Sequence, residues 1–139
     1  MSSSSFETAL VKTFFDMTTH LKIFHWQTQY FSNHKSADEL VSELLESMDE
    51  FMEIYQGIVG HRISLQPSTS MTISNMNMKK IVKKMQDFIS FLGQIQDTLP
   101  EDLMKQQTRK QKKDWKGLMN IRDEIIGKVQ TTLYLFTFV

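Results

Sequence analysis

Histidine and carboxylate residues that could bind a metal ion recur in the first half of the chain. His25 is followed by Trp26, and His34 comes nine residues after His25. Asp49 lies 15 residues after His34, and Glu53 lies four residues after Asp49. Side chains four residues apart share one face of a helix, so these two carboxylates can approach one point. Imidazole and carboxylate together suit iron, zinc or manganese better than magnesium or calcium. The pattern predicts a metal site.

Bulk composition narrows the class of protein. The chain has 139 residues, which predicts one domain over residues 1–139. It contains no cysteine, so disulfides, thiolate zinc sites and iron–sulfur clusters are excluded. Sixteen basic and sixteen acidic residues give a formal net charge of zero, which argues against gross electrostatic capture of nucleic acid.

Hydropathy gives an expected location. The first residues lack the basic and apolar regions of a secretory signal, and the longest apolar run, residues 133–139, is far shorter than the roughly 20 residues of a membrane span. We therefore expect an intracellular protein, neither secreted nor membrane-bound.

Apolar residues recur at steps of three and four in four segments, which predicts helices over residues 6–32, 36–60, 78–99 and 103–136. The predicted inward faces consist of Leu10, Phe14, Met17, Leu21, Phe24, Thr28 and Phe31; Leu40, Leu44, Met48, Phe51, Tyr55 and Ile58; Ile81, Met85, Phe88, Ile89, Leu92 and Ile95; and Trp115, Leu118, Ile121, Ile125, Val129, Leu133 and Phe136.

Several helix ends also have sequence signals. Ser4 or Ser5 is predicted to cap the first helix, and Ser36 with Glu39 fits a capping box that opens the second. Pro100 and the two acids after it resemble a helix start. The irregular segment 62–77 is long enough to cross the length of a bundle. The expected fold is all-α, a ferritin-like antiparallel four-helix bundle with one long crossover connection.

The metal-ligand pattern resembles the Dps-like branch of the ferritin superfamily over about residues 20–60. The matching features are Phe24-His25-Trp26, then His34, then Asp49 and Glu53. The resemblance implies iron-oxidising sites between two subunits, with His25 and His34 from one chain, Asp49 and Glu53 from its partner, and Trp26 beside the site. The family places its second histidine 12 residues after the first, with a glycine between them. This chain has a gap of nine without glycine.

A second resemblance is to small uncharacterised ferritin-like proteins of large DNA viruses. It is carried by His25-Trp26-Gln27-Thr28, by residues 49–53, by Ile121-Arg122-Asp123-Glu124 and by Leu133-Tyr134-Leu135. This resemblance implies the fold and a viral context, in the host cytoplasm or the virion, without implying an activity.

The last of the predicted helices adds Glu124 to the candidate ligands. Ile121 and Ile125 bracket Asp123 and Glu124, so one carboxylate is expected near the core, where it must be paired or metal-bound. One alternative is an ion pair with Arg122 or Lys128. The other is a site within one chain built from His25, Asp49 or Glu50, Glu53 and Glu124. Glu-x-x-His pairs, typical of di-iron bundles, are absent from the sequence. His20 and His61 are predicted to lie at the surface.

The leading functional interpretation is a metal-binding, ferritin-like homodimer or larger homo-oligomer. If active, it would oxidise Fe(II), with zinc or manganese as the other candidate metals. A non-catalytic structural or interaction protein that kept the bundle without metal is the alternative. Lysines at positions 79, 80, 83 and 84, and the basic stretch 105–116, leave nonspecific DNA binding as a minority interpretation.

Overall fold

The structure is a computed structural model and describes residues 3–67, 69–99 and 109–138. These residues form an all-α protein with the helices α1 (Ser3–Gln27), α2 (Phe31–Val59), α3 (Met78–Gly93), α4 (Ile95–Thr98) and α6 (Arg109–Leu135), and they contain no strand. The predicted helix start at Pro100 lies outside the described residues. None of the described helices is both long enough and apolar enough to cross a membrane.

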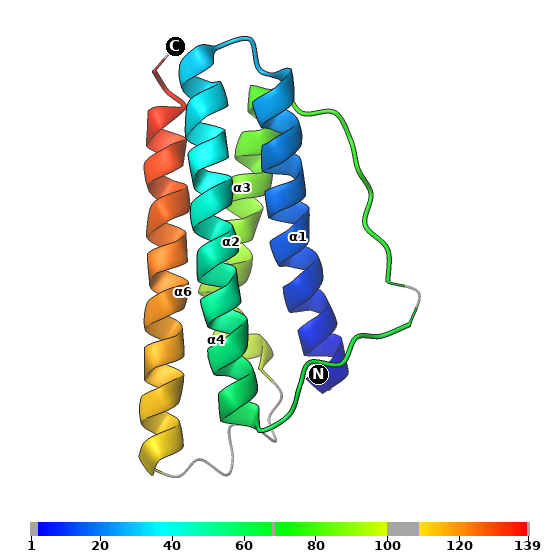
Figure 1. Cartoon of the computed structure of the whole chain (residues 1–139), viewed down its shortest axis with the longest axis vertical. Coiled ribbons are helices and arrows are strands. Elements are labelled where there is room, and N and C mark those ends of the chain that lie inside the picture. The colour runs from blue at the N-terminus through cyan, green and yellow to red at the C-terminus, as the bar shows by residue number, and fades with distance from the viewer. Residues whose placement is uncertain (1–2, 68, 100–108, 139) are drawn as a thin grey trace.

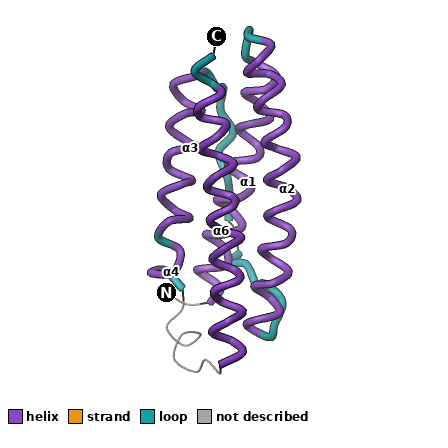
Figure 2. Tube along the Cα trace, turned by 90° about the vertical axis from the view of Figure 1, so that its left-hand side faces the viewer, coloured by secondary structure: helices purple, strands orange, loops and turns teal. Residues whose placement is uncertain are grey.

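The four long helices lie side by side along one axis (Figures 1 and 2). α2 packs against α1 and α6, and α3 packs against the same two helices from the other side. The chain runs up α1 and down α2, returns through the connection from residue 60 to residue 77, then runs down α3 and up α6 (Figure 1). The connection follows α1 over most of the length of the bundle, as the segment 62–77 predicted.

The predicted apolar faces form the core. Most of the predicted inward residues are buried, and they join one cluster across the four long helices. Thr28, Ile58, Ile89 and Leu133 are half-buried. Phe31 is an exception with 77% of its surface exposed. The chain leaves the helix after Gln27, so Phe31 opens α2 and does not continue the apolar face of α1.

Several predicted helix ends were wrong. α1 begins at Ser3, so neither Ser4 nor Ser5 precedes it as a cap. α2 begins at Phe31, which places Ser36 inside the helix instead of in a capping box. The helix predicted to end at residue 99 is interrupted after Gly93, and the short α4 follows; glycine is a poor helix former.

Other ends have clear chemical causes. Gly60 ends α2 with φ of 80°, a left-handed conformation that favours glycine, and its N–H donates to Gln56 O at 3.0 Å. Asn77 caps α3, because its side-chain oxygen accepts from the backbone N–H of Lys80 at 2.9 Å. The long connection is therefore held between two defined helix ends.

Candidate metal centre

His25 and His34 face each other across the turn between α1 and α2. Their ring centroids are 3.8 Å apart and the rings are inclined by 19°, a stacked arrangement. His25 is 9% exposed and His34 is half-buried. The residues that join the two helices, 28–30, are few enough to bring the end of one helix directly beside the start of the next. The two predicted histidine ligands thus form one pair.

Reciprocal hydrogen bonds orient the two rings. His25 Nδ1 lies 2.6 Å from the backbone oxygen of His34, and His34 Nδ1 lies 2.7 Å from the backbone oxygen of His25. A carbonyl oxygen accepts a hydrogen bond, so each Nδ1 carries the proton. In the neutral rings both Nε2 atoms therefore keep a free lone pair. Metal-binding histidines are commonly held in this way, with the other nitrogen donating to a carbonyl or carboxylate.

Asp38, which the metal-ligand pattern did not include, lies beside His25. Its Oδ1 lies 3.8 Å from His25 Nε2 and accepts from Lys22 Nζ at 2.7 Å. The Lys22 hydrogen bond, with added attraction from the charges of Lys22 and the two histidines, holds the pKa of Asp38 below its usual value against a smaller opposing effect of desolvation. Asp38 lies four residues after His34 on α2, a spacing that could have identified it.

The predicted carboxylate ligands do not meet this pair within one chain. Asp49 and Glu53 are exposed on α2, and the 15 residues from His34 to Asp49 correspond to about 22 Å along a helix axis. Glu124 is also exposed, on α6. Among the residues that the structure describes, no three His, Asp or Glu side chains lie together where they could hold a metal ion. The within-chain site built around His25 and Glu124 therefore does not form there.

The prediction that Asp123 or Glu124 lies near the core was wrong. Both carboxylates are exposed, because α6 turns Ile121 and Ile125 inward and leaves the residues between them outside. Asp123 accepts from Nε of its neighbour Arg122 at 2.7 Å. The same guanidinium donates to Leu92 O at 3.0 Å and so joins α6 to the end of α3.

The candidate ligands of α2 share one stripe along the helix, spaced by steps of four, four, three, four and four residues. The stripe consists of His34, Asp38, Ser42, Leu45, Asp49 and Glu53. Such steps keep side chains on one face. His34 and Asp38 are partly exposed, and the other four are exposed, so the stripe faces away from the core. We call it the α2 stripe.

A groove of about 590 Å³ lies beside the α2 stripe, between α1 and α2. Its lining combines Asp38 and Lys22 with apolar side chains that are unusually exposed. Trp26 is 68% exposed, Ile73 66% and Leu45 48%. Exposed apolar residues gathered in one place mark surfaces that bind other molecules. Trp26 lines the same groove as Asp38.

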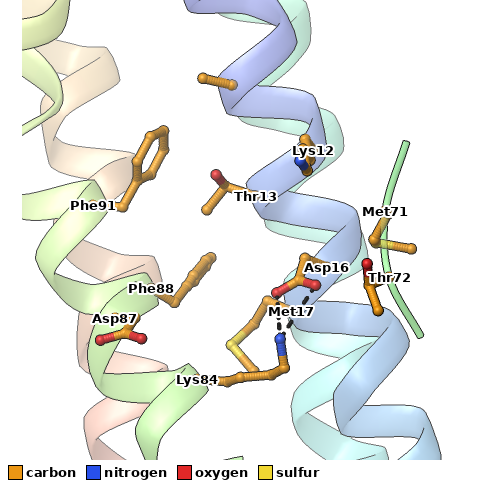
Figure 3. Close-up of a pocket in the computed structure, with 11 residues that line it drawn as sticks. Lys12, Thr13, Asp16, Met17, Met71, Thr72, Lys84, Asp87, Phe88 and Phe91 are labelled. Atoms are coloured by element: carbon orange, nitrogen blue, oxygen red, sulfur yellow. Dashed lines mark hydrogen bonds and ion pairs between the residues drawn. The ribbon is translucent and has the colours of Figure 1, made fainter. Parts of the chain in front are cut away.

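His20 forms a different kind of histidine site. It was predicted at the surface and is fully buried. Its Nδ1 donates to the backbone oxygen of Asp16 at 2.8 Å, and its Nε2 accepts from the backbone N–H of Ser74 at 3.3 Å. Asp16 also pairs with Lys84 of α3 at 3.1 Å (Figure 3). The Nδ1 bond thus orients the ring on α1, and the Nε2 bond fastens the connection to it. His61 is exposed, as predicted.

Glu7 is a buried carboxylate near the start of α1. It accepts hydrogen bonds from the Ser3 hydroxyl, from Tyr55 OH at 3.1 Å and from the backbone N–H of Ser64 at 2.8 Å. Burial, with a further contribution from Glu7, raises the pKa of the Tyr55 hydroxyl. Glu7 thus joins α1, α2 and the start of the connection. Its place within the first turns of a helix gave no sign of this role.

The basic segments lie at the surface. Lys79, Lys80 and Lys83 are exposed on α3, and Lys83 pairs with Asp87 at 2.6 Å. On α6, residues 109, 110, 112, 113 and 116 are exposed, whereas Lys105 lies outside the described residues. These side chains form a solvated face on each helix.

Comparison with known proteins gives a family without an activity. The model of a family described as a family of unknown function, DUF5856, matches residues 25–136. No curated protein and no solved structure matches the chain. The matched range includes the histidine pair, the α2 stripe and all of α6 up to Phe136.

Proposed function

The chain belongs to the DUF5856 family, and we propose that it is a ferritin-like protein that binds iron at sites shared between two copies of itself. The order of its long helices, two antiparallel pairs joined by one long crossover, supports the ferritin-like assignment (Figure 1). In each site His25, His34 and Asp38 come from one chain, and Asp49 and Glu53 come from the other. Glu124 lies on α6 away from the α2 stripe, and we leave it outside this set.

The observation that carries the proposal is the histidine pair. Both Nδ1 atoms donate to backbone carbonyls, which leaves a lone pair on each Nε2 of the neutral rings, and the Nε2 of His25 lies 3.8 Å from Asp38 Oδ1. If the pair had a purely structural role, we would expect hydrogen-bond partners for the Nε2 atoms as well. In the described chain these three side chains do not form a metal site by themselves. Two imidazoles and one carboxylate also leave further coordination positions of iron open. Carboxylates of a second chain could complete the site.

The α2 stripe indicates where they come from. The midpoint between His34 and Glu53 and the midpoint between Asp38 and Asp49 both fall between Glu43 and Leu44. A second copy whose α2 runs antiparallel, related by a two-fold axis at that midpoint, therefore brings its Asp49 level with Asp38 and its Glu53 level with His34. Two identical sites result, one at each end of the contact.

The centre of the same contact is apolar enough to hold two chains together. Leu45 and Ser42 are equally distant from the midpoint and would face their counterparts in the second copy. The groove next to them, with exposed Trp26 and Ile73, would be covered by the partner. Burying such side chains contributes about 25 cal/mol per Å² of apolar surface removed from water.

The chemistry follows from the ligand types. Three carboxylates of such a site would carry negative charge, which favours Fe(III) over Fe(II), and the two imidazoles would keep the ligand positions fixed. Iron is the substrate here. Each Fe(II) gives up one electron, and a hydrogen peroxide molecule that accepts two electrons becomes two hydroxide ions. The chain's residues bind Fe(II), and they stabilise the charge of Fe(III) after the electron has left.

Elemental analysis after Fe(II) loading and desalting tests the proposal. We expect the wild type to retain iron and the Asp49→Ala/Glu53→Ala variant to lose it. Glu46→Ala/Glu50→Ala is the matched control, because these two acids are also four residues apart and exposed on α2 but lie off the stripe. Iron retained by the control and lost by the stripe variant supports the site. Equal retention in all three chains would contradict it.

The alternative functions give different results in the same preparation. A structural or interaction protein retains no iron in any variant. A DNA-binding protein shows salt-dependent binding that weakens when Lys110, Lys112 and Lys113 are neutralised and is insensitive to the α2 stripe.

A further inference from the structure

Asn33 has a buried side-chain amide without a partner. The residue is fully buried in the first turn of α2, and neither its Oδ1 nor its Nδ2 has a hydrogen-bond partner. A buried donor or acceptor that lacks a partner costs about 1–3 kcal/mol. Buried amide groups are nearly always paired, so an exception calls for an explanation such as a bound molecule. Here the oxygen and the nitrogen of one amide both lack a hydrogen-bond partner.

The same residue borders a cavity at the end of the bundle where the turn between α1 and α2 lies. The cavity has a volume of about 800 Å³, is partly open to solvent and is bordered by that turn, the start of α3 and the end of α6. Much of its lining is apolar, from Phe24, Leu133 and Phe136. Known small-molecule sites have this size and character, apolar walls with a few polar groups that fix orientation.

The charge of the lining restricts the ligand. Among the described residues that line the cavity, none is an aspartate, glutamate, lysine, arginine or histidine. A charged ligand would lose part of its hydration there and gain no opposite charge from the lining, which favours a neutral ligand. The ligand is therefore neutral. The carboxamide of Asn33 offers one acceptor and one donor group in a single plane, so a matching ligand has a planar edge with a donor beside an acceptor.

We propose that this cavity binds a neutral, mainly apolar small molecule through a carboxamide or lactam group that pairs with the side chain of Asn33. This site is separate from the histidine pair and does not depend on iron. Its rim contains residues outside the helices, Thr28, Gln29 and Thr137, together with the 56% exposed Tyr30. Segments outside helices open at a lower free-energy cost than helices, which provides a route to the buried amide.

The test compares two probes with the same eight-carbon acyl chain, octanamide and methyl octanoate, by NMR of the full ¹⁵N-labelled chain. Only octanamide has a donor beside its carbonyl. We expect octanamide to shift the Asn33 Nδ2 resonance saturably and to bind about two- to tenfold more tightly than the ester, as one net hydrogen bond implies. Asn33→Leu should remove the preference and leave the affinity for the ester unchanged. Asn120→Leu, the same exchange at an exposed position of α6, should keep the preference.

Other outcomes overturn the proposal. Equal affinity for the two probes, or a preference that survives Asn33→Leu, means that Asn33 does not select the ligand. An Asn33 amide that contacts a long-lived water and does not shift with either probe means that water alone fills the site. Should Asn33→Leu fail to fold, Val82→Trp tests the cavity instead, because Val82 lines it and is only half-buried. The larger side chain should weaken both probes at least about tenfold, and unchanged affinities would contradict the site.

Discussion

His20 and His25 lie five residues apart on α1, yet the regions around them differ in how their polar groups are used. Around His20 every ring nitrogen has a partner, from Asp16 on one side and Ser74 on the other. Around His25 and His34 the Nδ1 atoms form hydrogen bonds to backbone oxygens, and the Nε2 of His25 lies 3.8 Å from the Asp38 carboxylate. The first region holds a connection in place. The second is oriented but incomplete, which is what a binding site for a metal ion requires.

The largest expected difference between the two regions is that iron binding by the His25 and His34 region depends on a second copy of the chain. Leu45→Arg places a charge at the centre of the proposed contact, and we expect the dimer to weaken at least about a hundredfold and iron retention to be lost. The folding of the His20 region should be unaffected. Sedimentation equilibrium measures the association, and elemental analysis measures the iron.

Leu65→Arg is the control for this change. Leu65 has the same 48% exposure as Leu45 but lies on the connection, away from the α2 stripe. A Leu45→Arg chain that still dimerises and retains iron would contradict the shared site.

Replacing His20, whose two ring nitrogens are both hydrogen-bonded, should mainly lower the stability of the fold. His20→Ala leaves a cavity and deprives the Ser74 N–H of its acceptor, so we expect a loss of about 2–4 kcal/mol in the free energy of unfolding. Iron retention should not change. Urea unfolding measures the loss, with the exposed His61→Ala as a control expected to stay within about 0.5 kcal/mol of the wild type. Unfolding midpoints that coincide for His20→Ala and wild type would show that the connection is held by other contacts.

The incomplete region should instead gain stability from metal. Zn(II), a probe without redox chemistry, binds the native state and should raise the free energy of unfolding by about 2.7 kcal/mol at a hundredfold excess over its Kd. In His25→Ala this gain should disappear, because one imidazole is lost together with the ring on which His34 stacks. Thermal or urea unfolding with and without Zn(II) measures the gain. An equal gain in both proteins would place the metal elsewhere.

The smallest expected effect concerns Asp38 in the metal-free protein. Lys22 lowers the pKa of Asp38 below 3.8, so the stabilising contribution is present above that pH and is lost as the pH falls through the folded-state pKa. We expect the unfolding midpoint of the wild type to exceed that of Asp38→Asn slightly near neutral pH, and the two midpoints to converge in acid. A difference independent of pH would show that the carboxylate charge does not stabilise the turn.

The sequence predicted the features that depend on local repetition. Apolar residues such as Leu10, Phe14 and Met17 recur every three or four positions, and this period alone identifies the helix and its buried face. The spacing of Asp49 and Glu53 likewise predicts that the two side chains share one face of α2, and there both are exposed.

Features that depend on contacts distant in the sequence were missed. His20 is buried because the connection, more than 50 residues later, crosses α1 at that point. The spacing of apolar residues within α1 carries no information about where a distant segment packs. Asp38 approaches His25 because α2 begins at Phe31, and the sequence analysis placed that start five residues later. The turn itself is stabilised by backbone oxygens of His25 and His34, which any residue carries.

A complementation experiment tests the central claim, that one metal site needs two chains. His34→Ala/Asp38→Ala chains lack one half of the ligands, and Asp49→Ala/Glu53→Ala chains lack the other half, so neither should retain iron alone. The two variants are unfolded together in equal amounts and refolded. Half of the resulting dimers should contain one chain of each variant, and each of these mixed dimers should have one intact site. The mixture should then retain about a quarter of the wild-type iron. No iron in the mixture, or iron in either variant alone, would contradict a site shared between two chains.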